Sequence, residues 1–243
     1  EIRQLRSVVR FRGALVNERR SIRNRVQILL DRNVWACERP ENFKDPFCSK
    51  GIKWMRDLKL PEREKVILEH CIELYFDVEK RIEDIEKMLT AQMKDIPEWK
   101  YLRTVPGFRS GGINSIVVLA EVSEIERFNK ARSFARYAGL MPKEHSSGDV
   151  RRMGRLIKGA NMHLRTAFIE STLAAIRSDQ GLKLYYEQVK ARRGSGAAIV
   201  ATARKLSMSV FHVLKEKRGY VPEKIKDYPP AADCHSWTAV DEI

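Results

Sequence analysis

The chain has 243 residues, enough to bury a hydrophobic core without disulfides or a structural metal. Its 46 lysines and arginines exceed its 32 acidic residues and give a formal net charge of +14, which favours a polyanionic partner, nucleic acid ahead of an anionic membrane. No segment is apolar for more than about eight residues, well short of the roughly 18 to 20 that span a bilayer, so we expect no membrane partner.

Cysteine and histidine positions show no metal-site pattern. The four cysteines are widely spaced, without a CxxC pair or a histidine at zinc-finger spacing. They predict free thiols in a reducing cytoplasm. They are Cys37, Cys48, Cys71 and Cys234. The chain begins with Glu1, inside a helical pattern, so we expect it to be part of a longer protein.

The first predicted element is a long helix from Ile2 to Trp35. Apolar residues recur there every three or four positions, and the segment contains no proline. Its polar positions hold nine arginines and no lysine. A solvated helix face and a phosphate-binding face both fit this pattern, and the planar guanidinium group favours phosphate.

A second long helix is predicted from Val66 to Met93, after a proline-containing stretch at residues 38–61 that must hold a loop and a short helix. The second helix is acidic between its apolar positions. We expect it to lie antiparallel to the first helix, in the manner of a coiled coil. Its carboxylates would complement some of the arginines, and the pair of helices would also join two protomers.

Shorter elements follow Pro97, which places a domain boundary near residue 95. The predicted organisation is all-α: a helical linker at 1–95, a compact helical domain at 96–219 and an extended or disordered tail at 220–243. Only "DVRRMGRLI", residues 149–157, has the pattern of a strand or hairpin. The predicted helices of the second domain are 114–122, 130–140, Met162–Arg177, Leu182–Lys190 and Ala197–Glu216.

A glycine-containing turn precedes the helix at 114–122. "TVPGFRSGG" has the form of a helix-hairpin-helix, in which glycines let backbone amides approach a phosphate. Gly107, Arg109 and Gly111 are its predicted nucleic-acid contacts. An ordinary turn between two helices fits the same residues equally well.

The densest group of cations lies near two serines. Ser146 and Ser147, followed by Gly148, precede four cations within eight residues, namely Arg151, Arg152, Arg155 and Lys158. On a helix starting near Gly159, one stripe would hold Lys158, Asn161 and Arg165. A serine held against a neutralised phosphodiester can attack phosphorus, whereas most Ser-Ser-Gly tripeptides form turns. Residue chemistry alone favours the turn.

Several motifs between about residues 100 and 218 resemble a known family. In chain order they are the Pro106-Gly107 turn, "ERF" at 126–128, "AGL" at 138–140 followed by Pro142, the Ser147-Gly148 pair, "GANMHLR" at 159–165 and "ARKL" at 203–206. Together they resemble the carboxy-terminal domain of the DEDD insertion-sequence transposases. In those recombinases a RuvC-like domain is joined to a helical domain, and a bridge RNA guides characterised members.

The resemblance implies roles for individual residues. Ser147 matches the family's nucleophilic serine, with Ser146 as the alternative. The cations from Arg151 to Arg165 would bind phosphates, and Arg192 and Arg193 would add backbone contacts. Two further cations, Arg204 and Lys205, would either bind the backbone or extend from a core helix.

Cofactor and partners also follow from the resemblance. In the resembled family, four carboxylates of the RuvC-like domain would hold Mg²⁺. The present sequence has no evident strand that bears such acids. We therefore expect a fragment that lacks its own metal site and does not cleave DNA by itself. The implied partners are DNA, a guide RNA and further copies of the chain, in the cytoplasm at the nucleoid. The alternative is a non-catalytic nucleic-acid-binding or oligomerisation module.

Overall fold

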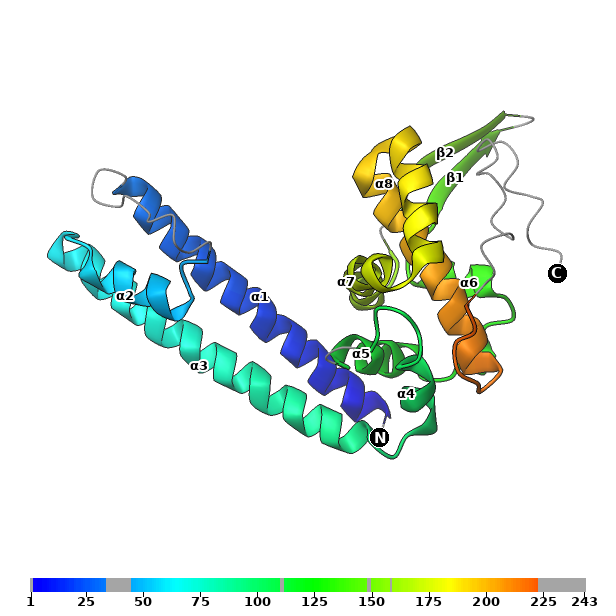
Figure 1. The fold of residues 1–243 in the computed structure, drawn as a ribbon, viewed down its shortest axis with the longest axis horizontal. Coiled ribbons are helices and arrows are strands. Elements are labelled where there is room, and N and C mark those ends of the chain that lie inside the picture. The colour runs from blue at the N-terminus through cyan, green and yellow to red at the C-terminus, as the bar shows by residue number, and fades with distance from the viewer. Residues whose placement is uncertain (1, 34–44, 110–111, 148–149, 158, 223–243) are drawn as a thin grey trace. The chain divides into compact units, whose positions relative to one another are not determined.

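The computed structural model describes residues 2–33, 45–109, 112–147, 150–157 and 159–222 (Figure 1). The chain divides into two compact units, one of Ser7–Met88 and one of Glu1–Arg6 with Leu89–Ile243. The described residues are mainly helical, which confirms the predicted fold class. Most of the predicted tail, residues 223–243, lies outside the described residues.

Two long helices dominate the unit Ser7–Met88. Helix α1 spans Ile2–Arg32 and helix α3 spans Glu62–Met93, and within this unit they run side by side in opposite directions (Figure 1). Apolar residues repeated at helical spacing, such as Ile22 and Ile82, meet in a continuous buried core. Burial of these faces stabilises both helices.

The short helix α2, Ser49–Asp57, completes this core. Its buried residues Ile52 and Met55 pack into the same cluster as the long helices. The Sγ atom of Cys48 accepts a hydrogen bond of 3.4 Å from the backbone N–H of Gly51 and caps the helix. Cys48 and Cys71 are free thiols, as predicted.

Ion pairs join α1 and α3 along their flanks. The guanidinium of Arg12 donates to Glu86 at 2.9 Å, and Arg19 donates to Glu79 at 2.6 Å. These two arginines therefore pair with carboxylates of the acidic second helix, as one of the two predicted roles of the first helix's arginines requires. The other predicted role was phosphate binding. Because the side chains are partly exposed, each pair contributes on the order of 1 kcal/mol or less.

The second unit contains five α-helices among its described residues. Helices α5 and α7 pack together, and α7 and α6 pack on α8. The fully buried rings of Phe108, Phe134 and Phe168 meet edge to face at centroid distances near 6.0 Å. The helices are α4 (Pro97–Leu102), α5 (Ile113–Val122), α6 (Ala131–Tyr137), α7 (Met162–Ser178) and α8 (Gln180–Lys215), with a 3-10 turn at Ile125–Arg127.

Helix α8 is interrupted at Gly194. Its backbone there has φ 79° and ψ 168°, so the two helices predicted from the sequence follow each other across a kink. By length and composition α8 passes as a membrane span, the one such helix among the described residues. Half of its most apolar window is buried within the protein, which is typical of a core helix.

A β-hairpin interrupts the helices of the second unit. Strand β1, Pro142–Ser147, pairs antiparallel with β2, Val150–Leu156, and the register is irregular between Pro142 and Glu144. The predicted strand at 149–157 is therefore confirmed. The helix predicted at Met162–Arg177 begins at Met162, and not near Gly159 as the cation stripe assumed, because Asn161 has extended backbone angles and caps it.

Candidate functional site

The predicted nucleophile lies at the end of strand β1. Ser147 is the last residue of the strand and is in register with Val150, while Ser146 is in register with Arg151. Both serines thus belong to a strand rather than to the turn that residue chemistry favoured. Gly148 and Asp149, which connect the strands, lie outside the described residues.

The antiparallel register brings the predicted cations to the same hairpin. Arg151 and Arg152 follow Val150 at the start of strand β2, opposite Ser146 and His145, and Arg155 lies near its end. Two other predicted contacts, Gly111 and Lys158, lie outside the described residues. A two-stranded pairing therefore places the serines and the first two arginines as neighbours across the strands.

Asn161 joins three elements of the second unit. Its Oδ1 accepts the backbone N–H of Leu164 at 3.0 Å and caps α7. Its Nδ2 donates to the Oε2 of Glu121 at 2.7 Å and to the hydroxyl of Tyr137 at 3.3 Å. The amide is thus occupied inside the protein, and its predicted contact with nucleic acid would compete with these bonds.

Glu121 is a fully buried carboxylate at the centre of this network. Besides the amide of Asn161, it has the Nε of Arg6 at 3.7 Å from its Oε2. A buried carboxylate is costly unless it is paired and hydrogen-bonded, so these partners are needed to keep it in the core. Glu121 was not among the site residues predicted from the sequence, although an acid within the apolar run "IVVLAEV" is a signal that could have identified it.

Tyr137 carries a perturbed phenol in the same network. Burial alone would raise the pKa of this phenol, but the hydrogen bond from Asn161 and the neighbouring Arg127 guanidinium outweigh burial and lower it. The Cζ of Arg127 lies 4.5 Å from the centre of the Tyr137 ring. The network is polar throughout and links α5, α6 and the start of α7.

We expect Asn161→Ala to lower the free energy of unfolding by about 2–4 kcal/mol, because it removes a helix cap and a donor to a buried carboxylate. Asn161→Asp keeps the cap but puts a second carboxyl beside Glu121, so at about pH 7 it should be at least as destabilising. Chemical denaturation at several pH values measures both effects.

The pH dependence separates the two variants. The neighbouring carboxylate raises the pKa of the introduced aspartic acid above its unfolded value, so the folded state binds more protons. Stability of Asn161→Asp should therefore rise as the pH falls from about 7 to about 5, relative to Asn161→Ala. A parallel response of both variants would contradict the buried contact with Glu121.

Arg165 also has an internal partner. Its Nη2 donates to the backbone carbonyl of Ile157, and its Nε is buried without a hydrogen-bond partner among the described residues. A Cβ at Gly139 would lie 2.2 Å from the same Nη2, so this glycine leaves room for the guanidinium. Arg165 fixes the segment between β2 and α7, next to the hairpin.

The glycine turn between α4 and α5 is tightly packed. Gly107 has φ 84°, and a Cβ there would lie 2.0 Å from the carbonyl oxygen of Ser171 on α7. Gly112, with φ 66°, is the N-cap of α5. Arg109 is exposed between them. Helices α4 and α5 flank this turn. Binding of a phosphate by the turn stays a prediction.

The remaining predicted contacts lie on α8. Arg192 and Arg193 are exposed, directly before the kink at Gly194. Lys205 is half-buried, with its Nζ 5.3 Å from the centre of the Tyr185 ring. Of the two readings left open for Lys205, extension from a core helix matches this packing.

The described carboxylates do not form a ligand set for Mg²⁺. Within the described ranges, no group of three or more histidines, cysteines, aspartates or glutamates lies close enough to hold a metal ion. Glu79 and Glu86 are engaged by arginines instead.

Sequence comparisons identify similar proteins. Residues 99–187 match the family model described as "Transposase IS116/IS110/IS902 family". A probable family 20 transposase of Pseudomonas aeruginosa is 24% identical over 226 residues, covering 91% of this chain and 66% of the relative. The transposase for insertion sequence element IS1111A of Coxiella burnetii is 25% identical over 225 residues, covering 90% of this chain and 61% of the relative.

A third relative is the insertion element IS110 uncharacterized 43.6 kDa protein of Streptomyces coelicolor. It is 28% identical over 137 residues, which cover 56% of this chain and 33% of that protein. The chain thus spans about two thirds or less of the curated relatives it matches. The matched region, 99–187, includes the glycine turn, the serine hairpin and the Asn161 network.

Proposed function

We propose that residues 99–187 form a transposase domain of the IS116/IS110/IS902 kind. The chain would then be the serine-bearing and nucleic-acid-binding part of a DNA transposase of a mobile element. One observation carries the proposal. The matched region contains a hairpin in which Ser146 and Ser147 end one strand, and Arg151 and Arg152 follow Val150 at the start of the strand paired with it. Phosphodiester chemistry needs this combination of a hydroxyl and cations.

The proposed reaction is a transesterification at phosphorus. The Oγ of Ser147 attacks a DNA phosphodiester, an Oγ–P bond forms and one P–O bond to deoxyribose breaks. The proton of the serine hydroxyl ends on the released sugar oxygen, so the step balances without a further reactant. The covalent phosphoserine conserves the bond energy, and a second sugar hydroxyl can reverse the step to join a new strand.

Arginines would contribute charge and position. Arg152, which strand alternation puts on the same face of the hairpin as Ser147, would neutralise the phosphate that Ser147 attacks, and Arg151 would do the same for Ser146. The Asn161 and Arg165 network would hold the segment after β2, and so fix where the hairpin leaves the helical core. Mg²⁺, held in the resembled family by another domain, would stabilise charge on the phosphate when bound.

The proposed partners are DNA, a guide RNA and a second copy of the chain, in the cytoplasm at the nucleoid. A groove along α1 and α3 supports the second copy. Its lining includes the apolar Phe11, Leu15, Leu74 and Val78 and the charged Glu18, Arg25 and Arg81, and Phe11 is 57% exposed and Leu74 47% exposed. Large exposed apolar residues on a helical hairpin are typical of helix association.

We expect the chain to bind duplex nucleic acid with strong salt dependence. If four or more phosphates are neutralised, affinity should fall at least about 100-fold between roughly 50 and 200 mM salt. Fluorescence anisotropy with two duplexes of scrambled sequence measures the slope and tests base preference, which should be slight. Affinity that does not change with salt would contradict the proposal.

A further inference from the structure

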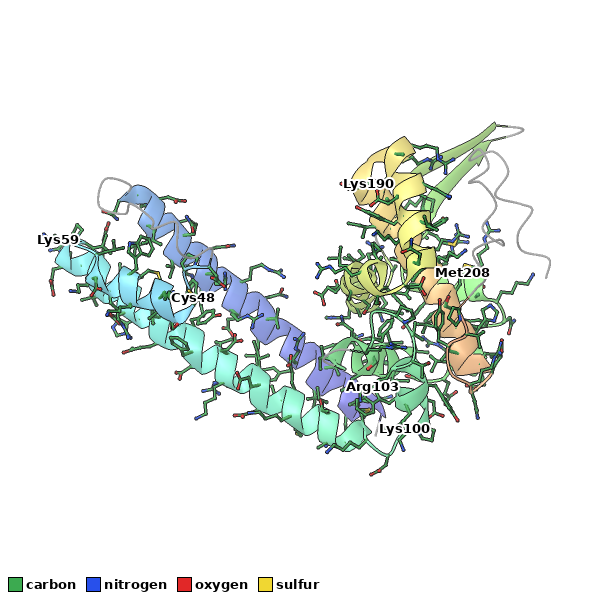
Figure 2. All side chains as sticks on the ribbon, viewed as in Figure 1. Cys48, Lys59, Lys100, Arg103, Lys190 and Met208 are labelled. Atoms are coloured by element: carbon green, nitrogen blue, oxygen red, sulfur yellow. The ribbon has the colours of Figure 1, made fainter. Side chains whose placement is uncertain are left out.

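An open hollow of about 620 Å³ lies beside α4, at the glycine turn. Its lining contains four cations and no acid. Two of these cations, Lys100 and Arg103, lie close together at the end of α4 (Figure 2). The lining residues are Lys94, Trp99, Lys100, Arg103, Thr104 and Arg109. We propose that this hollow binds a phosphate group of a nucleic-acid backbone.

Among the described residues, the cations of the hollow have no acidic partner, unlike some arginines of the long helices. Arg12 and Arg19 on α1 pair with glutamates of α3. In the part of the chain that the structure describes, neither Lys94, Lys100, Arg103 nor Arg109 forms an ion pair, and all four are exposed. Like charges gathered around one concavity repel one another, and a bound polyanion removes that repulsion.

Arg103 is held in place without a carboxylate. Its Cζ lies 4.9 Å from the centre of the Trp99 ring, and its Nη2 donates to the carbonyl of Arg109 at 3.3 Å. These contacts orient the guanidinium while leaving its other N–H groups available. A guanidinium fixed in this way loses little entropy when it binds a phosphate.

Trp99 adds a second feature that indicates an anion. Its side chain is only 5% exposed, and its indole N–H is buried without a hydrogen-bond partner among the described residues. Helix α5 begins against the same ring, because a Cβ at Gly112 would lie 3.3 Å from its Cζ2. The N-cap of α5 has no side-chain partner, and the positive end of that helix lies against Trp99, one of the residues that line the hollow.

Helix-end electrostatics alone do not account for the cluster. Lys94 follows the end of α3 and Lys100 lies in the last turn of α4, where single cations are favourable. Arg109 belongs to neither helix end, and Arg103 donates to the carbonyl of Arg109 as well as stacking on Trp99. Thr104 is occupied too, because its hydroxyl donates to Tyr101 and accepts the N–H of Tyr220. A bound phosphate accounts for all four cations.

The proposal rests on the proposed nucleic-acid binding and is tested by charge removal. The 243-residue chain with Lys94→Gln and Lys100→Gln is compared with a matched control carrying Lys59→Gln and Lys65→Gln, two exposed lysines of the other unit. Anisotropy with a DNA duplex and with an RNA duplex of the same sequence gives affinity against salt. We expect the hollow variant to bind about tenfold more weakly and its salt slope to fall by about 1, because one phosphate is no longer neutralised.

A second readout follows the indole of Trp99. In ¹H–¹⁵N spectra, Trp99→Phe identifies its N–H signal, which should shift on addition of duplex to the wild-type chain and stay in place in the Lys94/Lys100 variant. Circular dichroism shows whether each variant is folded. If the Lys94/Lys100 variant loses affinity for just one of the two duplexes, that duplex, DNA or RNA, supplies the phosphate.

The outcomes separate the two proposals. If the wild-type chain binds neither duplex, both the proposed function and the proposed phosphate site in the hollow are wrong. A wild-type chain that binds with strong salt dependence, while the hollow variant behaves like the control and the Trp99 signal does not move, overturns the hollow alone.

Discussion

Ser147→Ala in the complete gene product is expected to abolish covalent protein–DNA adducts and to lower recombination by roughly 10³-fold or more, as loss of a nucleophile does in other covalent enzymes. The alanine side chain has no hydroxyl with which to form the Oγ–P bond. Adducts are measured on denaturing gels with element-end DNA, and recombination is measured in a plasmid assay. Affinity for DNA should stay within about twofold, since the cations are unchanged.

Ser146→Ala is the matched control, because it removes a hydroxyl from the preceding residue of the same strand. Full adduct formation in this variant, with none in Ser147→Ala, assigns the nucleophile to Ser147. The reverse pattern transfers the role to Ser146. If both variants retain adducts, the serine mechanism is wrong, and the alternative of a non-catalytic nucleic-acid-binding module gains support.

The β-hairpin bears directly on the proposed mechanism. A serine in a mobile turn would lose much of its conformational freedom on each encounter with a phosphate. Ladder hydrogen bonds restrict the backbone of Ser146 and Ser147, and the register places Arg151 opposite Ser146 and Val150 opposite Ser147. A shift of one residue would move every side chain of the strand to the other face. Pre-orientation of this kind is what positional catalysis requires.

Helices were the most predictable part of the fold. Apolar spacing predicted α7 as Met162–Arg177, and it spans Met162–Ser178. The predicted second long helix ends at Met93, as α3 does. Such agreement arises because an amphipathic helix records its buried face in its own sequence, every three or four residues.

The hairpin was only half predictable. The pattern of residues 149–157 indicated a strand, whereas its partner "PKEHSS" has no alternation of apolar and polar residues. Pairing between the strands supplies what local sequence lacks. The serines lie on that partner strand. Because its sequence has no strand pattern of its own, residue chemistry favoured a turn for them.

The hydrogen-bond network around Glu121 and Asn161 could not be predicted from local sequence. Glu121 contacts Asn161, 40 positions later, and Arg6, on another element. A sequence shows the acid within an apolar run, but it does not show which distant groups neutralise it. The same applies to Asn161, whose motif suggested phosphate binding while its amide caps α7 and binds the buried carboxylate.

Gly107→Ala is expected to destabilise the second unit by about 3–5 kcal/mol, because two costs combine. Its φ of 84° is in the left-handed region, which costs alanine about 1 kcal/mol or more. The added Cβ would also lie 2.0 Å from the Ser171 carbonyl oxygen, a backbone atom of α7 that cannot rotate away. Differential scanning calorimetry should show a fall in Tm on the order of 10 °C for a unit of this size.

Gly159→Ala is the matched control for this prediction. Nothing lies within 4 Å of the Cβ it would add, and its φ is not in the left-handed region, so its Tm should change by about 2 °C or less. Equal Tm values for both variants would show that the turn does not contact α7 as described. If Gly107→Ala instead stays fully stable and binds duplex more weakly, the glycine serves the approach of a phosphate, as a helix-hairpin-helix would require. A large loss of stability together with unchanged affinity in the folded fraction would assign Gly107 to helix packing alone.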